Sequence, residues 1–344
     1  MLYSLQALRA FAAWVVVCHH FMQIFFDFKA SGPVGQLLAD RGAVGVDIFF
    51  VISGLVIYLS TRDKTVAPRE FLLNRILRIV PAYWFYTALM AALLLAFSQW
   101  MPHQEFSWHH LLLSMLFIPA ENPGGYGLYP TLNVGWTLNF EMLFYLLFGL
   151  AFFVRQRHHL LLVTAVLLLV SEVLGRMGVL SRFYNNDIIY EFLLGIGLGV
   201  MYRRGLIRQG RWLPLVLLAA AVLAIYHLDA SQRLLHWGIP SALIVLAFIA
   251  LEPLFAGNRV LKALGDCSYS VYLIHVLVLY AGWFASQRLQ LNPYLVFALC
   301  VPSIALLSWF SYQWLERGLY RRMRAWLAAP QEAGQAYTLS RVKY

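Results

Sequence analysis

The chain has 344 residues, of which 61% are hydrophobic and only 12% are charged, and its mean hydropathy is +0.67. Because a soluble domain carries about 25% charged residues, this composition excludes a soluble enzyme, a disordered chain and a disulfide-rich secreted domain. The class that remains is an all-α, polytopic transmembrane helix bundle. The net charge of +10 therefore bears first on the orientation of the chain in the membrane.

Ten apolar segments are predicted to be spanning helices, which need roughly 20 residues each. They are 4–27, 43–61, 79–98, 131–153, 159–174, 187–202, 212–227, 235–255, 268–286 and 294–315. The segments at 159–174 and 187–202 are short, so we expect them to be tilted, broken or partly buried. The stretch from 108 to 119 is too short to span and is predicted to be interfacial or re-entrant. We expect one transmembrane domain over residues 1–316 and a basic tail over 317–344.

The basic residues fall mainly on one side of these segments. With the N-terminus in the cytoplasm, 19 of the 26 Lys and Arg residues lie in cytoplasmic loops and the tail, and 6 lie in loops on the other side. This asymmetry satisfies the positive-inside rule and predicts that both termini are cytoplasmic. The positive charge therefore requires no nucleic-acid partner.

Two ionisable residues in the first segment lie on one face of the predicted helix. Arg9 and His20 are eleven residues apart, which places them within about 20° of each other and about 16 Å apart along the axis. This arrangement suits a substrate that enters from the cytoplasm, with its anionic end at Arg9 and its reacting end at His20. Hydrogen bonding between helices is the alternative explanation. His19 points about 100° away from this face and is expected to be structural.

Arg75 and Arg78 form an R-x-x-R pair just before the third predicted helix. Two guanidinium groups with this spacing share one helix face and can bind phosphates. The alternative is that they anchor the chain to lipid headgroups, as juxtamembrane arginines commonly do.

Three other predicted helices carry polar residues at depth, where a charge is unfavourable and usually functional. Glu141 and Glu191 are each able to orient an imidazole, accept a proton or pair with an arginine, and the sequence does not rank them. Ser268, Tyr272 and His275 follow i, i+4, i+7 spacing and share a helix face.

Six motifs occur in order along nearly the whole chain. They are R-x10-H (Arg9 and His20), G-V-D-I-F-F-V-I-S-G (45–54), R-I-L-R (75–78), W-T-L-N-F-E (136–141), S-Y-S-V-Y-L-I-H (268–275) and W-L-E-R (314–317). In this set the sequence resembles the acyltransferase-3 family of bacterial membrane acyltransferases, particularly its stand-alone exopolysaccharide O-acetyltransferases. One departure is Gly318, at a position after the last helix where the family often has proline.

The resemblance implies an enzyme of the bacterial inner membrane that moves an acyl group, usually acetyl, from a cytoplasmic coenzyme A thioester to a saccharide hydroxyl. Acetyl-CoA would be a substrate. The three widely spaced cysteines indicate neither a disulfide framework nor a zinc site, and no cofactor or metal is expected. The expected roles are catalysis by His20 and Glu141, donor binding by Arg9, Arg75 and Arg78, and lining of a tunnel by Ser53, Trp136, Ser268, Tyr269 and His275.

Within these roles, His20 is expected to deprotonate the acceptor hydroxyl or to accept the acyl group first. Glu141 is expected to orient the active-site network or compensate its charge. The alternative functions are a transporter or flippase of a lipid-linked sugar, and the same chemistry on peptidoglycan, a periplasmic glucan or a small metabolite. The one-sided arginines around a buried histidine, without an evident inverted repeat, favour the acyltransferase. The oligomeric state stays open, with a homodimer as one alternative.

Overall fold

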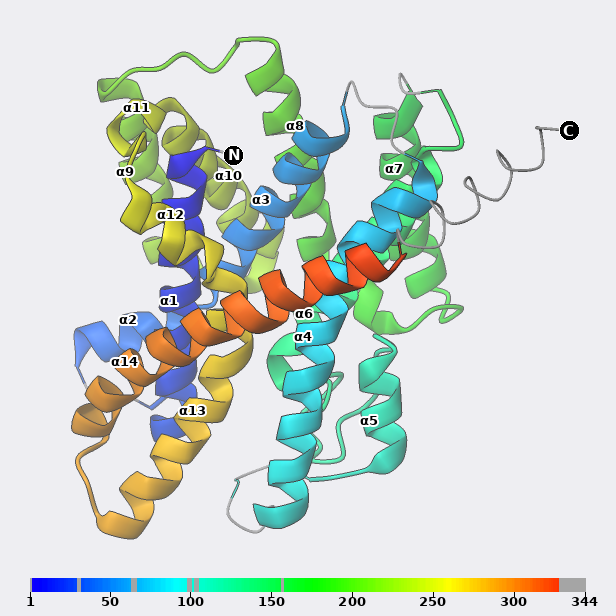
Figure 1. The fold of residues 1–344 in the computed structure, drawn as a ribbon. Coiled ribbons are helices and arrows are strands. Elements are labelled where there is room, and N and C mark those ends of the chain that lie inside the picture. The colour runs from blue at the N-terminus through cyan, green and yellow to red at the C-terminus, as the bar shows by residue number, and fades with distance from the viewer. Residues whose placement is uncertain are drawn as a thin grey trace, which may run out of the picture.

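The computed structural model describes residues 2–29, 32–62, 67–97, 101, 105–155 and 158–327. Within these ranges all the regular elements are helices (Figure 1). The α-helices are α1 (Tyr3–Phe26), α2 (Pro33–Arg41), α3 (Val44–Thr61), α4 (Pro68–Phe97), α5 (Trp108–Met115), α6 (Trp136–Ala151), α7 (His159–Leu168), α8 (Glu191–Arg203), α9 (Trp212–His227), α10 (Ile239–Ala250), α11 (Glu252–Phe255), α12 (Arg259–Asp266), α13 (Ser268–Leu289) and α14 (Pro293–Ser311). Short 3₁₀ or π segments are η2 (Asn133–Gly135), η4 (Leu169–Gly175), η5 (Arg182–Tyr184), η6 (Asp187–Tyr190), η7 (Ala230–Gln232), η8 (Leu234–Gly238) and η9 (Tyr312–Leu319).

Each of the ten predicted apolar segments forms a helix, and the all-α, multi-pass character of the chain is confirmed. Six helical stretches of the described chain are long and apolar enough to cross a membrane, namely Tyr3–Phe26, Val44–Thr61, Pro68–Phe97, Asn133–Ala151, Ser268–Leu289 and Pro293–Leu327. The helices formed by the other four segments are shorter. The number of ten spans and the orientation of the termini stay predictions.

Two helices extend beyond their predicted limits. Helix α4 begins at Pro68, and proline is well accommodated in a first helical turn. Arg75 and Arg78 therefore lie inside this helix and not before it. At the other end of the chain, α14 continues through η9 as one helical stretch to Leu327. It thus passes the expected boundary between residues 316 and 317 without a break, and residues 328–344 of the predicted tail lie outside the described residues.

The segment predicted to be interfacial or re-entrant contains α5, an eight-residue helix. It packs beside α4. Tyr83 donates a hydrogen bond of 3.0 Å from its hydroxyl to the carbonyl of Ser114, and Trp84 Nε1 donates one of 2.8 Å to the carbonyl of Met115. These two contacts fix the C-terminal end of α5 to the middle of α4.

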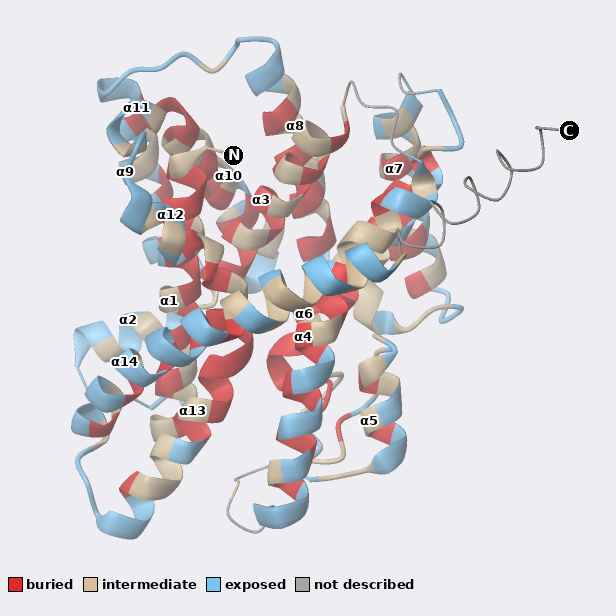
Figure 2. Ribbon diagram, viewed as in Figure 1, coloured by how far each residue is buried: buried red, intermediate tan, exposed pale blue. Residues whose placement is uncertain are grey.

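Many residues of α1, α3 and α13 are buried, while α5, α9 and α14 expose much of their surface (Figure 2). Helix α3 packs along α8 at glycines: a Cβ atom at Gly195 would lie 2.0 Å from the Val51 carbonyl oxygen, and one at Gly54 would lie 2.1 Å from that of Phe192. A Cβ at Gly45 would lie 2.4 Å from the carbonyl oxygen of Ala12 in α1. Small residues thus let the backbones of α1, α3 and α8 touch, as is typical of packed membrane helices.

Two carboxylates from distant parts of the chain fix the ends of central helices. Glu252 accepts hydrogen bonds of 2.8 Å from the backbone amides of Tyr3 and Ser4, which satisfies free donors at the start of α1. The fully buried Asp47 forms a bidentate ion pair with Arg233, with both N···O distances at 2.9 Å. This pair connects the first turn of α3 to the segment before η8.

Candidate active site

A small internal cavity of about 110 Å³ lies among α1, α3, α4, α6 and α13. Three of its lining residues are the predicted donor-binding arginines, Arg9 from α1 and Arg75 and Arg78 from α4. We call it the arginine cavity. The predicted residues Ser53, Glu141, Ser268 and Tyr269 also line it.

The arginines of this cavity form few contacts that would compete with a bound anion. Arg75 donates a hydrogen bond of 3.0 Å from Nη2 to Ser60 Oγ, and its guanidinium lies 5.5 Å from the centre of the Phe71 ring. Neither Arg9 nor Arg78 forms an ion pair with a carboxylate in the part of the chain that the structure describes. The cavity is therefore suited to an anionic ligand.

Hydrogen bonds hold the Glu141 carboxylate in the arginine cavity. Its Oε1 accepts a hydrogen bond of 2.8 Å from Ser53 Oγ in α3 and another from the hydroxyl of Tyr145, one turn further along α6. Of the other predicted lining residues, Tyr269 donates from its hydroxyl to the carbonyl of Ile79 at 2.9 Å, whereas the buried Ser268 Oγ has no hydrogen-bond partner among the described residues.

Glu316 is a charged neighbour of this cavity that the sequence analysis did not include among the site residues. It lies in η9, accepts a hydrogen bond from Ser270 and interacts electrostatically with Arg9 and Arg78. Glu316 is part of the W-L-E-R motif, but the sequence alone does not reveal that η9 lies close to the first helix.

A second and larger cavity, of about 780 Å³, contains the predicted catalytic histidine. Its lining includes His19, His20 and Arg233, and we call it the histidine cavity. Most of its other side chains are aromatic, namely Phe25, Phe26, Phe28, Tyr126, Tyr129, Trp136, Tyr272, Tyr280 and Trp283. Large aromatic surfaces with a few polar groups are typical of ligand-binding pockets.

His20 is paired with His275, and their surroundings define the tautomers. His275 Nδ1 lies 3.0 Å from the carbonyl oxygen of Val271, and because a carbonyl only accepts, this nitrogen carries the proton. His275 Nε2 is then an acceptor, at 3.1 Å from His20 Nδ1, which also lies 3.1 Å from the Val16 carbonyl. In the neutral form of His20, Nδ1 is therefore the protonated nitrogen, and Nε2 carries a lone pair able to accept a proton.

The structure thus separates residues that the sequence grouped in a single tunnel. The two predicted catalytic residues are divided as well, since Glu141 lines the arginine cavity and His20 lines the histidine cavity. Trp136 lines the histidine cavity, and His275 lines neither of the two and lies behind His20.

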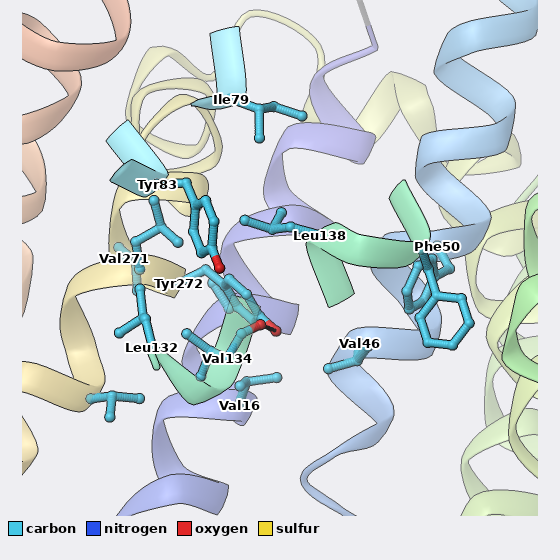
Figure 3. Packing of buried hydrophobic residues seen from close by; sticks show 14 of the residues in the cluster. Val16, Val46, Phe50, Ile79, Tyr83, Leu132, Val134, Leu138, Val271 and Tyr272 are labelled. Atoms are coloured by element: carbon cyan, nitrogen blue, oxygen red, sulfur yellow. Dashed lines mark hydrogen bonds between the residues drawn. The ribbon is translucent and has the colours of Figure 1, made fainter. Parts of the chain in front are cut away.

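The two cavities share two lining residues within the described chain, Val46 of α3 and Tyr272 of α13. Figure 3 shows both side chains in the packed core beside Val16 and Val134. The sequence placed Tyr272 on the same face as His275, yet only the fold shows that its ring lies where the cavities meet.

The sequence model of the acyltransferase-3 family, described as an acyltransferase domain, matches residues 2–312. The chain belongs to this family. Because the match extends from α1 through α14, the acyltransferase domain includes both cavities. The protein is an acyltransferase of the membrane bundle type, as its motifs predicted.

Known relatives of this acyltransferase-3 protein agree with that assignment. It is 33% identical over 314 residues to the exopolysaccharide production protein ExoZ of Rhizobium meliloti (strain 1021), over 86% of this chain and 95% of ExoZ. It is 26% identical over 312 residues to the acyltransferase MdmB of Streptomyces mycarofaciens, over 81% of this chain and 79% of MdmB.

A third relative is YrhL of Bacillus subtilis (strain 168), whose name contains the words peptidoglycan O-acetyltransferase. It is 26% identical over 329 residues, which cover 80% of this acyltransferase and 48% of YrhL. No solved structure matches the chain.

Proposed function

We propose that this acyltransferase moves an acetyl group from cytoplasmic acetyl-CoA to a hydroxyl of an exopolysaccharide or lipid-linked saccharide, in the inner membrane of a bacterium. The observation that carries the proposal is the pairing of a cavity with three arginines and a neighbouring cavity with an oriented histidine. The basic loops support an orientation with both termini in the cytoplasm. The arginine cavity would then be the side from which the donor enters.

The arginine cavity suits the phosphate groups of coenzyme A. Guanidinium groups bind phosphate oxygens through paired, charge-assisted hydrogen bonds, which are stronger than neutral ones. Arg9 and Arg78 have no carboxylate ion pair among the described residues. Arg75 is held in position by Ser60. In this arrangement the donor would place its thioester toward Val46 and Tyr272.

His20 would act as the general base of the transfer. Its Nε2 accepts the proton of the acceptor hydroxyl while the hydroxyl oxygen attacks the thioester carbonyl carbon. The new ester C–O bond forms, the C–S bond breaks, and the thiolate of coenzyme A leaves in the arginine cavity. The proton taken up by His20 is then transferred to the thiolate, so the products are the ester and the free thiol of coenzyme A. Initial attack by His20 Nε2 on the acyl carbon is the alternative order.

Glu141 would act through the arginines and not by contact with His20. Its carboxylate lines the arginine cavity and is held there by Ser53 and Tyr145. A fixed negative charge beside three guanidinium groups compensates part of their charge before the donor binds. This is the charge-compensating role considered for Glu141 from the sequence.

The histidine cavity suits a saccharide acceptor. Its aromatic side chains offer flat faces against which the C–H groups of a sugar ring pack, and His20 is in reach of a bound molecule because it lines the same cavity. The name of ExoZ supports an exopolysaccharide acceptor. Peptidoglycan, a periplasmic glucan or a small metabolite would require the same chemistry, whereas a flippase would not require a base beside the arginine cavity.

Transfer is tested with the purified protein in proteoliposomes, supplied with radiolabelled acetyl-CoA and glycolipid extracted from the producing cells. We expect label in the glycolipid fraction and equal release of free coenzyme A. NMR spectra of polysaccharide from cells with and without the protein then identify the modified hydroxyl. If the O-acetyl signals are the same in both and no label is transferred, the proposed function is wrong.

A further inference from the structure

The place where the two cavities meet suggests what limits the acyl group. Val46 and Tyr272 line both cavities, while the donor-binding arginines line one and the catalytic His20 lines the other. An acyl group delivered from the arginine cavity must therefore pass these two side chains to react at His20. We call the pair the partition.

Hydrogen bonds fix the Tyr272 side of the partition. The Tyr272 hydroxyl donates a hydrogen bond of 2.9 Å to the carbonyl of Val134. A second hydrogen bond, also of 2.9 Å, joins the same hydroxyl to Thr137 Oγ1. Both partners belong to the segment that starts α6, so α13 is tied to α6 through this ring. Phe49 packs against the ring edge to face, with the ring centres 6.1 Å apart. Tyr272 therefore has little freedom to swing out of the way.

The Val46 side is equally constrained, because both of its neighbours in α3 are held. Gly45 lies against the backbone of α1, and even a Cβ at this position would clash with Ala12. Asp47 forms the buried bidentate ion pair with Arg233. Helix α3 is thus packed directly against α1 and tied by an ion pair to the segment before η8 at this point. Figure 3 shows the Val46 side chain directed from α3 toward the side on which Tyr272 lies.

We propose that the partition formed by Val46 and Tyr272 selects the acyl group by size, and restricts this enzyme to acetyl over longer or carboxylated acyl groups. The inference rests on the proposed function, since it assumes a coenzyme A thioester as donor. The partition presents an isopropyl group and an aromatic ring held at fixed positions, and well-packed protein interiors resist the insertion of extra methylene groups. It also offers no cation to a carboxylate such as that of a succinyl group, because Arg233 is already paired with Asp47.

The test compares acetyl-, butyryl- and succinyl-CoA as donors, with kcat/KM measured for each in proteoliposomes. For the wild-type enzyme we expect acetyl to be preferred to butyryl by about 100-fold, since each methylene in a tight site changes kcat/KM by about 10-fold or more. The Val46→Ala variant removes two methyl groups and should lower this preference by about 10-fold. Val46→Ile should instead reduce acetyl transfer and increase the preference for acetyl over butyryl.

A matched control is available on the same helix. Val51 is fully buried in α3 but lines neither cavity, so Val51→Ala makes the same deletion and should keep the wild-type donor preference. Tyr272→Phe keeps the ring, removes its two hydrogen bonds and should weaken the preference in the direction of Val46→Ala. If Val46→Ala does not fold, Val46→Ile and Tyr272→Phe decide the question.

The outcomes separate the inference from the function on which it rests. A wild-type enzyme that transfers acetyl, with the same donor preference in the folded Val46 and Tyr272 variants as in Val51→Ala, would overturn the partition and leave the proposed function standing. A wild-type enzyme that transfers no acyl group from any of the three thioesters would overturn the proposed function itself. A wild-type enzyme that uses butyryl-CoA as well as acetyl-CoA would also contradict the partition.

Discussion

The arginine cavity and the histidine cavity differ in size, charge and surface. The first has a volume of about 110 Å³ and is lined by three arginines. The second has a volume of about 780 Å³, and nine of its twenty lining residues are Phe, Tyr or Trp. A narrow cationic cavity suits one extended anionic ligand, whereas a wide aromatic cavity suits a ring-shaped, largely neutral one.

One helix contributes to both cavities. Helix α1 contributes Arg9 to the first cavity and His20 to the second, and the partition formed by Val46 and Tyr272 lies between them. Donor binding and proton transfer are therefore expected to respond separately to mutation.

The largest effect is expected from removal of His20, the proposed base in the histidine cavity. His20→Ala should lower kcat by between about 10² and 10⁴-fold, which is the range for a general base. Binding of coenzyme A should change little, because none of the arginines proposed to bind the donor is altered. His227→Ala, which removes an exposed imidazole at the end of α9, is the control. Acetylation near the wild-type rate in a correctly folded His20→Ala protein would contradict the assignment.

A smaller effect, with the opposite pattern, is expected in the arginine cavity. Arg78→Ala should weaken coenzyme A binding by about 10-fold, and the Arg75→Ala, Arg78→Ala double variant by about 100-fold, because each hydrogen bond between charged groups contributes about 1.5–3 kcal/mol. Titration calorimetry in detergent measures the affinities. Arg69→Ala, at an exposed position of the same helix, should bind normally. Unchanged affinity in the double variant would exclude these arginines as the donor site.

The smallest effect is expected from His275, which positions His20 without lining either cavity. His275→Leu removes the acceptor for His20 Nδ1–H and should lower kcat by about 10-fold, with the KM for acetyl-CoA unchanged. His275→Gln keeps an acceptor oxygen near the position of Nε2 and should restore part of the rate. Equal loss in both variants, or a parallel rise in KM, would show that His275 only supports packing.

Much of this architecture could be predicted from one sequence, since apolar length and helical spacing are local properties. The ten apolar segments all form helices, and the R-x-x-R arginines and Arg9 do line one cavity. The start of α4 was placed too late because the polar residues from Pro68 onward lack the hydropathy of a membrane segment, although they continue the same helix.

The division of the site could not be predicted, because it depends on residues from other helices. Helical geometry places Arg9 and His20 on one face, but it says nothing about Val46 and Tyr272, which come between their cavities from α3 and α13. The Asp47–Arg233 ion pair joins residues 186 positions apart, and no local pattern indicates such a partner. The same holds for Glu316, which the fold returns to Arg9.

The partition also has a consequence for the energy supply of the cell. A membrane enzyme with water-filled cavities on both faces would conduct protons if these cavities joined, because a file of water molecules relays protons rapidly. An apolar constriction that excludes water blocks such a path. Val46 and the ring of Tyr272 are expected to block a water path between the two cavities. Donor and acceptor would then meet in the bundle without a leak of protons across the bilayer.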